Sequence, residues 1–418
     1  MSWQDKILES VRETKKASFN AAGFSSGLKN LFLGRLAVNL DMQRKDIIRA
    51  NQRDLERCGR SGLSGAFMDR LALTEKRIDK MAEAVNTVRL LPDPVGAKIW
   101  ETRRPNGLLI ERVRVPIGVI GIIYESRPDV TVEAAILCVK SGNCVILRGG
   151  REARHSNRML VSILRKSLLE VSMPEEMVNL VSTGGRRAVR YLLSMSALID
   201  LVIPRGGESL IETVVRNSRI PVIKHYKGVC HTYVDSDADM EMAIKVAVNA
   251  KVQRPSTCNA TETLLVHRDI APDFLPKIAE IFRSEKVEIR GCGETRKILP
   301  GIKPAVDSDW STEYLDLVIS VKVVDSADEA VEHINMHGTR HSESIITGNR
   351  DTAANFLSRV DAAAVFHNAS TRFTDGGEFG LGAEIGISTD KIHARGPMGL
   401  EELTTYKYVI HGNGQTRQ

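Results

Sequence analysis

The stretch that decides the fold begins Ile117-Gly118-Val119-Ile120-Gly121-Ile122-Ile123 and ends Cys144-Val145-Ile146-Leu147-Arg148-Gly149-Gly150. Both runs are short, apolar and rich in β-branched residues, which predicts buried strands. Between them, the segment around Val132 to Val139 has the apolar pattern of a buried helix. A strand, a helix and a second strand in this order predict a parallel βαβ unit.

The same alternation continues along the chain. Further strand-like runs are Val178 to Val181, Ile199 to Ile203 and Ile220 to Ile223, with helical patterns between them. Five strands that alternate with helices predict a doubly wound, mostly parallel sheet, and such sheets bind ligands at the carboxyl ends of their strands.

A second α/β segment follows and predicts a separate domain, joined to the first near residue 236. Its predicted strands are His231 to Val234, Thr263 to Val266, Leu317 to Val321, Ser344 to Ile346 and Ala363 to Phe366. A chain of 418 residues is long enough for two or three domains.

Two further regions lie before the first strand. The first ninety residues predict helices, one of which begins near Thr74 with its apolar residues spaced by three and four positions. Residues 98–115 contain Asn106-Gly107 between two strand-like runs, which predicts a two-stranded ribbon. The ribbon has little of its own to pack against, so it is a candidate arm for pairing with another subunit.

The composition excludes several classes of protein. The chain is 42% hydrophobic and 26% charged, with a formal charge of +6, as in ordinary globular proteins. The apolar run Val115 to Tyr124 is much shorter than the ~20 residues of a membrane-spanning helix. The charged segment Met1 to Lys16 does not resemble a secretory signal. We therefore expect a cytoplasmic protein that binds neither membranes nor nucleic acid.

The charge distribution and the cysteines indicate which ligands the chain could bind. Nine Lys and Arg against four Glu lie between Arg148 and Arg190, which indicates either a phosphate-bearing ligand or a solvated helix face. The six cysteines contain no C-x-x-C pair and no zinc-finger His companion, so no metal site is predicted.

Two turns at predicted strand ends are candidate phosphate sites, although the G-x-G-x-x-G fingerprint and the P-loop are absent. They are Arg148-Gly149-Gly150 and Arg205-Gly206-Gly207. Each places a pair of glycines at the start of a helix, where free N–H groups could face a phosphate. A plain tight turn is the alternative.

The loop Gln253 to Asn259 contains Cys258 in a polar, Pro-containing turn close to Lys251 and Arg254. A nucleophilic cysteine needs access and a lowered pKa, which nearby cations supply. From the residues alone, Cys258 is either such a nucleophile or an ordinary thiol.

A second loop, residues 368–399, is dense in Gly, Thr, Arg and Asp and too long for a simple connection, which favours a functional role. Its charged residues either bind a small charged substrate or stabilise the loop through salt bridges. His337 and His341 are read as solvent-exposed loop histidines rather than metal ligands, because Gly338 interrupts a helical spacing.

These motifs together resemble the gamma-glutamyl phosphate reductases, also called glutamate-5-semialdehyde dehydrogenases, of the aldehyde dehydrogenase superfamily. The likeness runs nearly end to end. It is carried by residues 115–121, Tyr124 to Pro128, residues 145–150, residues 203–207, Gln253 to Asn259, residues 368–382 and His393 to Gly399.

The resemblance implies an aldehyde dehydrogenase-like α/β fold with two Rossmann-like parallel-sheet domains and an oligomerisation flap. The implied NADPH-binding domain is formed by residues 1–97 and 115–235, and the catalytic domain by residues 236–402. The flap comprises residues 98–114 and 403–418 and would make a homo-oligomer, a dimer or a tetramer.

The resemblance also implies site residues. Cys258 is the expected nucleophile, with the backbone N–H groups of Cys258 and Asn259, and Ser126, as oxyanion donors. Arg127 and Arg372 are expected to bind the substrate phosphate and carboxylate, in either order. The expected cofactor ligands are Arg148, Gly149, Gly150, Arg151, Gly206, Gly207 and Glu313.

The implied reaction is covalent. Cys258 attacks the acyl carbon of L-glutamyl 5-phosphate, phosphate leaves, and the thioester accepts hydride from NADPH to give glutamate 5-semialdehyde. A water-activating Glu has no counterpart around residues 226–229, which fits a phosphate leaving group. The unstable acyl phosphate would make transient contact with glutamate 5-kinase attractive, but no residue indicates it.

Three alternatives remain from the sequence. The chain could be a related acyl-phosphate or aldehyde dehydrogenase with another substrate, which would differ in residues 368–399. It could be a non-catalytic assembly module that uses residues 98–114. It could bind nucleic acid through residues 148–190, with steep salt dependence and no need for Cys258.

Overall fold

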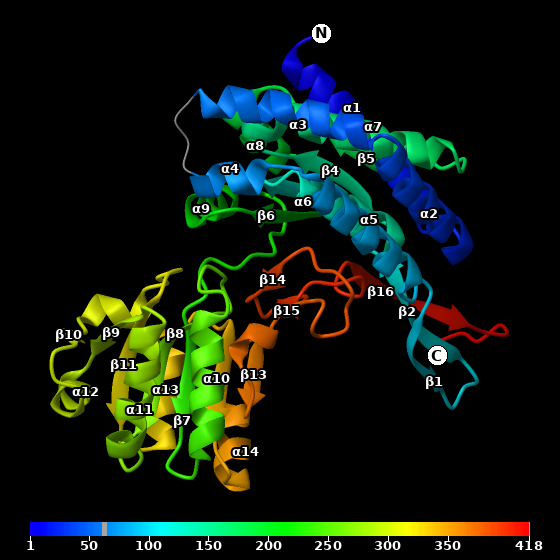
Figure 1. Ribbon diagram of the computed structural model, residues 1–418. Helices are drawn as coiled ribbons and strands as arrows, with labels where there is room; N and C mark the ends of the chain where they lie inside the picture. Colours follow the sequence, from blue (N-terminus) through cyan, green and yellow to red (C-terminus); the bar gives the residue numbers. More distant parts are fainter. Residues whose placement is uncertain (61–64, 418) are drawn as a thin grey trace. The chain divides into compact units, whose positions relative to one another are not determined.

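The computed structural model describes residues 1–60 and 65–417 (Figure 1). They form two compact units. The first unit comprises Met1–Lys224, Gly380–Gly386 and Met398–Gln418, and the second comprises His225–Phe379 and Ile387–Pro397. The units divide at residues 224 and 225, earlier than the predicted boundary after residue 235, because strand β7 (Cys230–Val234) pairs within the second sheet.

The first unit is built on a parallel sheet in the order β5-β4-β3-β6. Its strands are β3 (Val119–Tyr124), β4 (Cys144–Arg148), β5 (Val178–Leu180) and β6 (Leu201–Arg205). The predicted strand at 220–223 is wrong: this segment makes only an isolated bridge between Val222 and Val202. Pro221 lies within it and has no N–H to extend a ladder.

Helices cover this sheet (Figure 1). They are α1 (Trp3–Ala21), α2 (Ser26–Met42), α3 (Arg44–Gly59), α4 (Gly65–Leu71), α5 (Glu75–Leu90), α6 (Asp129–Lys140), α7 (Arg154–Leu169), α8 (Gly185–Leu193) and α9 (Glu208–Asn217), with short 3₁₀ turns Arg151–Ala153 and Glu175–Met177. The helix predicted after Thr74 is confirmed as α5. The Thr74 side chain caps it by accepting the Arg77 N–H, and Ile78, Met81, Val85 and Val88 form its buried face against α2 and α6.

The predicted ribbon is also confirmed. Strands β1 (Lys98–Arg103) and β2 (Leu109–Pro116) are antiparallel, and the turn between them is closed by a Gly107 N–H bond of 2.9 Å to the Arg104 carbonyl. A third strand, β16 (Thr404–His411), pairs with the whole length of β2. The ribbon and the C-terminal segment therefore form one antiparallel sheet of order β1-β2-β16.

The second unit contains a longer parallel sheet in the order β10-β9-β11-β8-β7-β12-β13. Besides β7, its strands are β8 (Thr261–His267), β9 (Glu288–Gly291), β10 (Lys303–Pro304), β11 (Val318–Val324), β12 (Ser342–Ile346) and β13 (Ala364–His367). Its helices are α10 (Met240–Val252), α11 (Ala271–Ser284), α12 (Gly293–Ile298), α13 (Ala327–His337) and α14 (Arg350–Arg359), with 3₁₀ turns Asp307–Ser311 and Thr371–Phe373.

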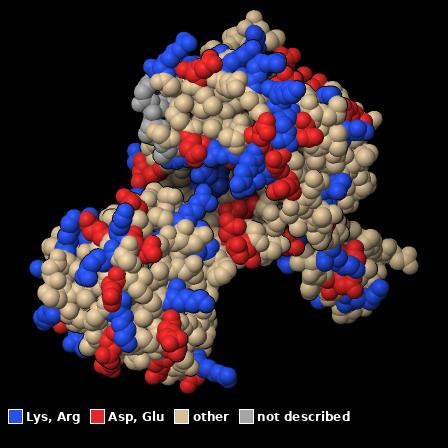
Figure 2. Space-filling view, in the orientation of Figure 1, with Lys and Arg blue, Asp and Glu red and all other residues tan. Residues whose placement is uncertain are grey.

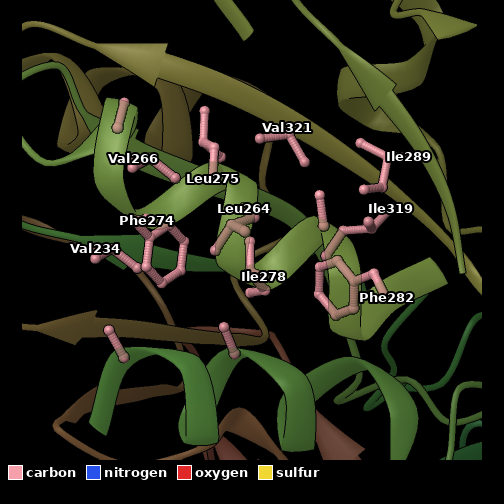
Figure 3. Packing of buried hydrophobic residues seen from close by; sticks show 14 of the residues in the cluster. Val234, Leu264, Val266, Phe274, Leu275, Ile278, Phe282, Ile289, Ile319 and Val321 are labelled. Carbon is pink, nitrogen blue, oxygen red and sulfur yellow. The ribbon is translucent and has the colours of Figure 1, made fainter. Parts of the chain in front are cut away.

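The core of the second unit forms where α11 packs on the sheet (Figure 3). Phe274 and Phe282 from α11 are fully buried and lie next to strand residues such as Leu264 and Ile319. Burial of a large apolar side chain stabilises a fold by roughly 1.5–3 kcal/mol, so this contact fixes the helix on the sheet.

The loop at residues 368–399 is irregular, as predicted, apart from the 3₁₀ turn Thr371–Phe373 and the short strands β14 (Ile387–Ser388) and β15 (Gly396–Pro397). It divides between the units. Gly380–Gly386 belongs to the first unit, where the Ile385 N–H donates to the Met398 carbonyl and the Met398 N–H to the Gly386 carbonyl. The predicted catalytic domain of residues 236–402 therefore includes segments that pack with the first unit.

Candidate active site

The Cys258 loop lies at the amino end of the second sheet. It connects α10 to β8, and Cys258 is half-buried. Gly228, which leads into β7, runs in contact with it: a Cβ on Gly228 would lie 1.7 Å from the Cys258 carbonyl oxygen. Only glycine fits this close approach, so β7 and β8 together fix the backbone of the cysteine.

Glu313 acts on the same backbone. Its Oε1 accepts the Gly228 N–H at 2.8 Å. This carboxylate, predicted as a cofactor ligand, is therefore engaged next to the Cys258 loop in the second unit. One of its oxygens orients Gly228, which in turn contacts Cys258.

Asn259 connects the Cys258 loop to residues 371–374. Its Nδ2 donates to the carbonyls of Arg372 (3.2 Å) and Thr374 (3.0 Å), and its Oδ1 accepts from Thr257 Oγ1 at 3.0 Å. The Asn259 carbonyl accepts from Thr371 Oγ1 at 2.7 Å. Because the side-chain amide is used within the fold, any contribution of Asn259 to an oxyanion comes from its backbone N–H.

Arg372 supplies a cation close to the thiol. Its Nε donates to Gln253 Oε1 at 2.9 Å, which directs the guanidinium to the Cys258 loop. Burial, followed by the charge of Arg254, lowers the pKa of Arg372, and the negative charge of a Cys258 thiolate opposes this shift. The two groups are thus close enough to interact, and a neighbouring cation favours a thiolate.

A buried polar layer lies beside this loop, and Lys251, predicted as a cation near Cys258, belongs to it. Lys251 pairs with Glu262, and His231 pairs with Glu343 through Nδ1 at 3.0 Å and through its backbone N–H at 2.6 Å. All four side chains are fully buried. Burial raises the pKa of Glu262 to about 7, although Lys251 opposes the shift.

His341 corrects one sequence prediction. It was expected in a solvent-exposed loop, but it is fully buried before β12, with its Nδ1 2.8 Å from Ser342 Oγ. Burial lowers its pKa to about 3, so the ring is neutral at physiological pH. His337 is half-buried at the end of α13.

In the first unit, the other candidate residues lie at the carboxyl ends of the strands. Arg148 ends β4, and its guanidinium donates to the carbonyls of Val181 (3.1 Å) and Gly185 (3.0 Å). Burial lowers its pKa. Gly149 follows it in a position where a Cβ would lie 2.2 Å from Asn157 Nδ2. Arg148 therefore orders the loop before α8, and Gly149 keeps the turn tight.

The second glycine turn has a carboxylate partner. The Gly207 N–H at the start of α9 donates to Glu125 Oε2 at 2.9 Å, and the Glu125 N–H donates to the Arg205 carbonyl. The free N–H group expected at Gly207 is thus taken by Glu125, which neutralises part of the helix N-terminus. Gly206 lies against the same carboxylate.

Ser126, Arg127 and Arg151 lie on the neighbouring turns of the first unit. Ser126 is buried after β3 and Arg127 is exposed. Gly150 faces this turn, since a Cβ on it would lie 3.4 Å from the Ser126 nitrogen. The Arg151 side chain is 91% exposed and only 3.5 Å from its neighbour Glu152. It is the predicted cofactor cation with the most freedom to reach a ligand.

Part of the basic segment 148–190 is used within the fold, whereas Arg154, Arg186, Arg187 and Arg190 are exposed. Arg158 donates to Ser182 Oγ at 3.0 Å and Arg165 Nε to the Val178 carbonyl at 2.8 Å, as Arg148 does to its carbonyls. Figure 2 shows Lys and Arg interspersed with Asp and Glu on the visible surface of this unit.

The predicted site residues fall into two groups, one in each unit. The first unit contains Ser126, Arg127, Arg148, Gly149, Gly150, Arg151, Gly206 and Gly207, and the second contains Cys258, Asn259, Glu313 and Arg372.

Comparison with known proteins identifies the class. The family model described as the aldehyde dehydrogenase family matches residues 42–296. An engineered glycolyl-CoA reductase with bound NADP⁺ shares the fold, with a TM-score of 0.66 at 15% identity over 96% of this chain and 95% of that one.

Relatives with higher sequence identity define the group within this family. The gamma-glutamyl phosphate reductase of Halothermothrix orenii is 54% identical over 418 residues and 100% of both chains. The crystal structure of gamma-glutamyl phosphate reductase from Thermotoga maritima has a TM-score of 0.97 and 51% identity, covering 98% of this chain and 99% of that one. The chain belongs to the aldehyde dehydrogenase family and, within it, to the gamma-glutamyl phosphate reductases. Among residues 1–60 and 65–417, no helix is long and apolar enough to cross a membrane.

Proposed function

We propose that this chain catalyses the NADPH-dependent reduction of L-glutamyl 5-phosphate to L-glutamate 5-semialdehyde and phosphate, the second step of proline biosynthesis from glutamate. The observation that carries the proposal is the full-length identity to gamma-glutamyl phosphate reductases, 54% over 418 residues. The Cys258 loop supports it, because its surroundings suit a nucleophilic thiolate.

Cys258 starts the reaction. The Arg372 cation stabilises its thiolate, and Gly228 and Asn259 fix its backbone. Attack on the acyl carbon expels phosphate and leaves a thioester on Cys258. The backbone N–H groups of Cys258 and Asn259 are the proposed donors to the oxyanion, with Ser126 as a third.

The carboxylates of the second unit fit a reaction without an activated water. Glu262 and Glu343 are fully buried in pairs, and an oxygen of Glu313 binds the Gly228 N–H. Glu262 and Glu343 are therefore not accessible as bases, and Glu313 is engaged by the Gly228 N–H. Phosphate is a good leaving group, so acyl transfer from an acyl phosphate does not need one.

The Arg148-Gly149-Gly150 turn of the first unit is the proposed site for the pyrophosphate of a dinucleotide, because the Gly207 N–H of the other turn is taken by Glu125. Gly149 and Gly150 keep this turn tight against Asn157 and Glu152, and Arg151 is an accessible cation for the additional phosphate of NADPH. When bound, NADPH supplies the hydride that reduces the thioester. Arg127 and Arg372 are the proposed ligands of the substrate phosphate and carboxylate, since a guanidinium suits both anions.

The β1-β2-β16 sheet is the proposed contact for a homo-oligomer. It exposes Trp100, Tyr406, Tyr408 and Ile410, and exposed apolar groups on one small sheet favour association. The cytoplasm is the proposed location, where the product of glutamate 5-kinase would be available.

The test is the reverse reaction. Glutamate 5-semialdehyde, NADP⁺ and phosphate are mixed with the intact protein and with Cys258→Ala, and NADPH absorbance is followed. We expect phosphate-dependent reduction of NADP⁺ that falls on the order of 10³-fold or more in the variant. Turnover without phosphate would instead identify a hydrolytic dehydrogenase, and no turnover in either protein would contradict the proposal.

A further inference from the structure

A second thiol lies next to the nucleophile in the second unit. Cys230 is the first residue of β7 and is fully buried. Its Sγ donates a hydrogen bond of 3.2 Å to the carbonyl oxygen of Cys258. Gly228 brings the start of β7 into contact with the Cys258 backbone, so the two cysteines are neighbours although 28 residues separate them in sequence.

The two thiols differ in their environment. Cys258 is half-buried in a polar turn with the Arg372 cation close by, whereas Cys230 is enclosed in the sheet. Burial, the charge of Glu343 and the charge of Cys258 raise the pKa of Cys230 well above its ordinary value. Cys230 is therefore a protonated thiol, and Cys258 is the one that peroxides can reach and oxidise.

We propose that Cys230 is a resolving thiol that forms a reversible disulfide with the oxidised nucleophile. The inference rests on the proposed function, in which Cys258 is the reactive thiol. Cys258 lies at the amino edge of the second sheet. Because it is the proposed nucleophile, its over-oxidation would end catalysis permanently. A neighbouring thiol converts this damage into a bond that a cellular dithiol can reduce.

The chemistry has two balanced steps, with a peroxide as the oxidant. The Cys258 thiolate attacks one oxygen of hydrogen peroxide, the O–O bond breaks, and the sulfur becomes a sulfenic acid while hydroxide leaves. The Cys230 sulfur then displaces the hydroxyl group from the Cys258 sulfur. The S–S bond forms, and the Cys230 proton leaves with the hydroxyl as water.

The test uses the full chain without cofactor or substrate, treated with hydrogen peroxide and digested without reduction. We expect a cross-linked peptide pair containing Cys230 and Cys258 that is about 2 Da lighter than the sum of the reduced peptides and disappears with dithiothreitol. In Cys230→Ser, whose hydroxyl can still donate to the Cys258 carbonyl, we expect sulfinic acid at Cys258, about 32 Da heavier and not reversed by dithiothreitol.

Cys292→Ser is the matched control, because it removes another half-buried thiol of the same unit, one beside Thr295 Oγ1 at 3.3 Å. It should form the cross-link as the unchanged protein does. Sulfinic acid at Cys258 at equal rates with and without Cys230 would overturn the proposal. Iodoacetamide separates the two claims: normal alkylation of Cys258 without any cross-link overturns only the resolving role, whereas an unreactive Cys258 contradicts the proposed function as well.

Discussion

The two parallel sheets carry their candidate functional loops at opposite ends. In the first unit, Ser126, Gly149 and Gly206 follow strands β3, β4 and β6, at the carboxyl edge where doubly wound sheets bind ligands. In the second unit, Gly228 and Cys258 precede strands β7 and β8, at the amino edge. Two parallel sheets of one chain therefore carry candidate functional loops at different edges, the carboxyl edge in the first unit and the amino edge in the second.

The distribution of polar and apolar residues along the strands reflects this difference. In the first sheet, β3 and β4 are apolar almost throughout. In the second sheet, β8 begins Thr261-Glu262-Thr263 and continues Leu264-Leu265-Val266, and β12 begins Ser342-Glu343-Ser344 before Ile345-Ile346. All of these residues are buried. Buried polar residues confined to one half of a strand therefore indicate which end of a parallel sheet carries a site.

The strongest test of this comparison removes one polar group from the second sheet. Glu343→Ala leaves the backbone N–H and the ring of His231 without their partner in a fully buried place. We expect a loss of about 3–5 kcal/mol in the free energy of unfolding of the second unit. Urea denaturation measures it, with the exposed Glu280→Ala as control. Equal losses in both variants would mean that the polar layer contributes little.

A smaller effect is expected at the loop of Cys258, the proposed nucleophile. Gly228→Ala places a Cβ 1.7 Å from the Cys258 carbonyl oxygen, so the loop must move. A displacement of about 1 Å costs roughly 100-fold in kcat/KM. Steady-state kinetics tests this against Gly293→Ala, whose Cβ meets nothing within 4 Å. Unchanged kinetics in Gly228→Ala would show that this contact does not position the thiol.

The first unit has a half-buried carboxyl group with a raised pKa, Glu133 on α6. Burial and the charge of Asp129 raise its pKa from 4.5 to about 7. The folded state therefore binds the proton more tightly. The stabilising contribution is complete below pH 4.5 and is lost as the pH rises through 7.

Glu133→Gln should remove this pH dependence. Between pH 5 and pH 8, we expect the unchanged protein to lose about 2 kcal/mol more than the variant in the free energy of unfolding of the first unit. Chemical denaturation at the two pH values measures the difference. Parallel losses in the two proteins would show that Glu133 titrates normally.

The smallest effect is expected at the turn that we propose binds NADPH. Arg148→Met removes the hydrogen bonds to the Val181 and Gly185 carbonyls and loosens the loop before α8. We expect the KM for NADPH to rise about tenfold, or about 1.4 kcal/mol, with little change in kcat. Arg216→Met on α9, with a side chain 76% exposed, is the control. A fall in kcat at constant KM would place Arg148 in the chemical step instead.

Much of the fold was predictable because apolar periodicity directly reflects burial. The βαβ start, the α5 face and the Asn106-Gly107 ribbon all follow from local patterns. Residues 220–223 were wrongly predicted as a strand, because the apolar run suggests a ladder that Pro221 prevents. The surroundings of the second group of site residues were harder to predict: His341 has the sequence context of an exposed loop and is buried only through tertiary packing.

The site was predictable only where a loop motif carries it. Cys258 and Arg372 lie in polar loops that attract attention, and the structure brings them together. The buried pair of His231 and Glu343 joins two strands that are 112 residues apart, so no local pattern reveals it. Glu125, which occupies the Gly207 N–H, was missed for the same reason.

The antiparallel sheet has a consequence for synthesis on the ribosome. Strand β16 pairs with β2 from Thr404↔Pro116 to His411↔Leu109, so the last segment of the chain completes a sheet begun almost three hundred residues earlier. The second unit is nearly continuous in sequence and can acquire its contacts while this segment is still unmade. Until then, β2 has an unpaired edge on a nascent chain, and this edge is where premature association would begin.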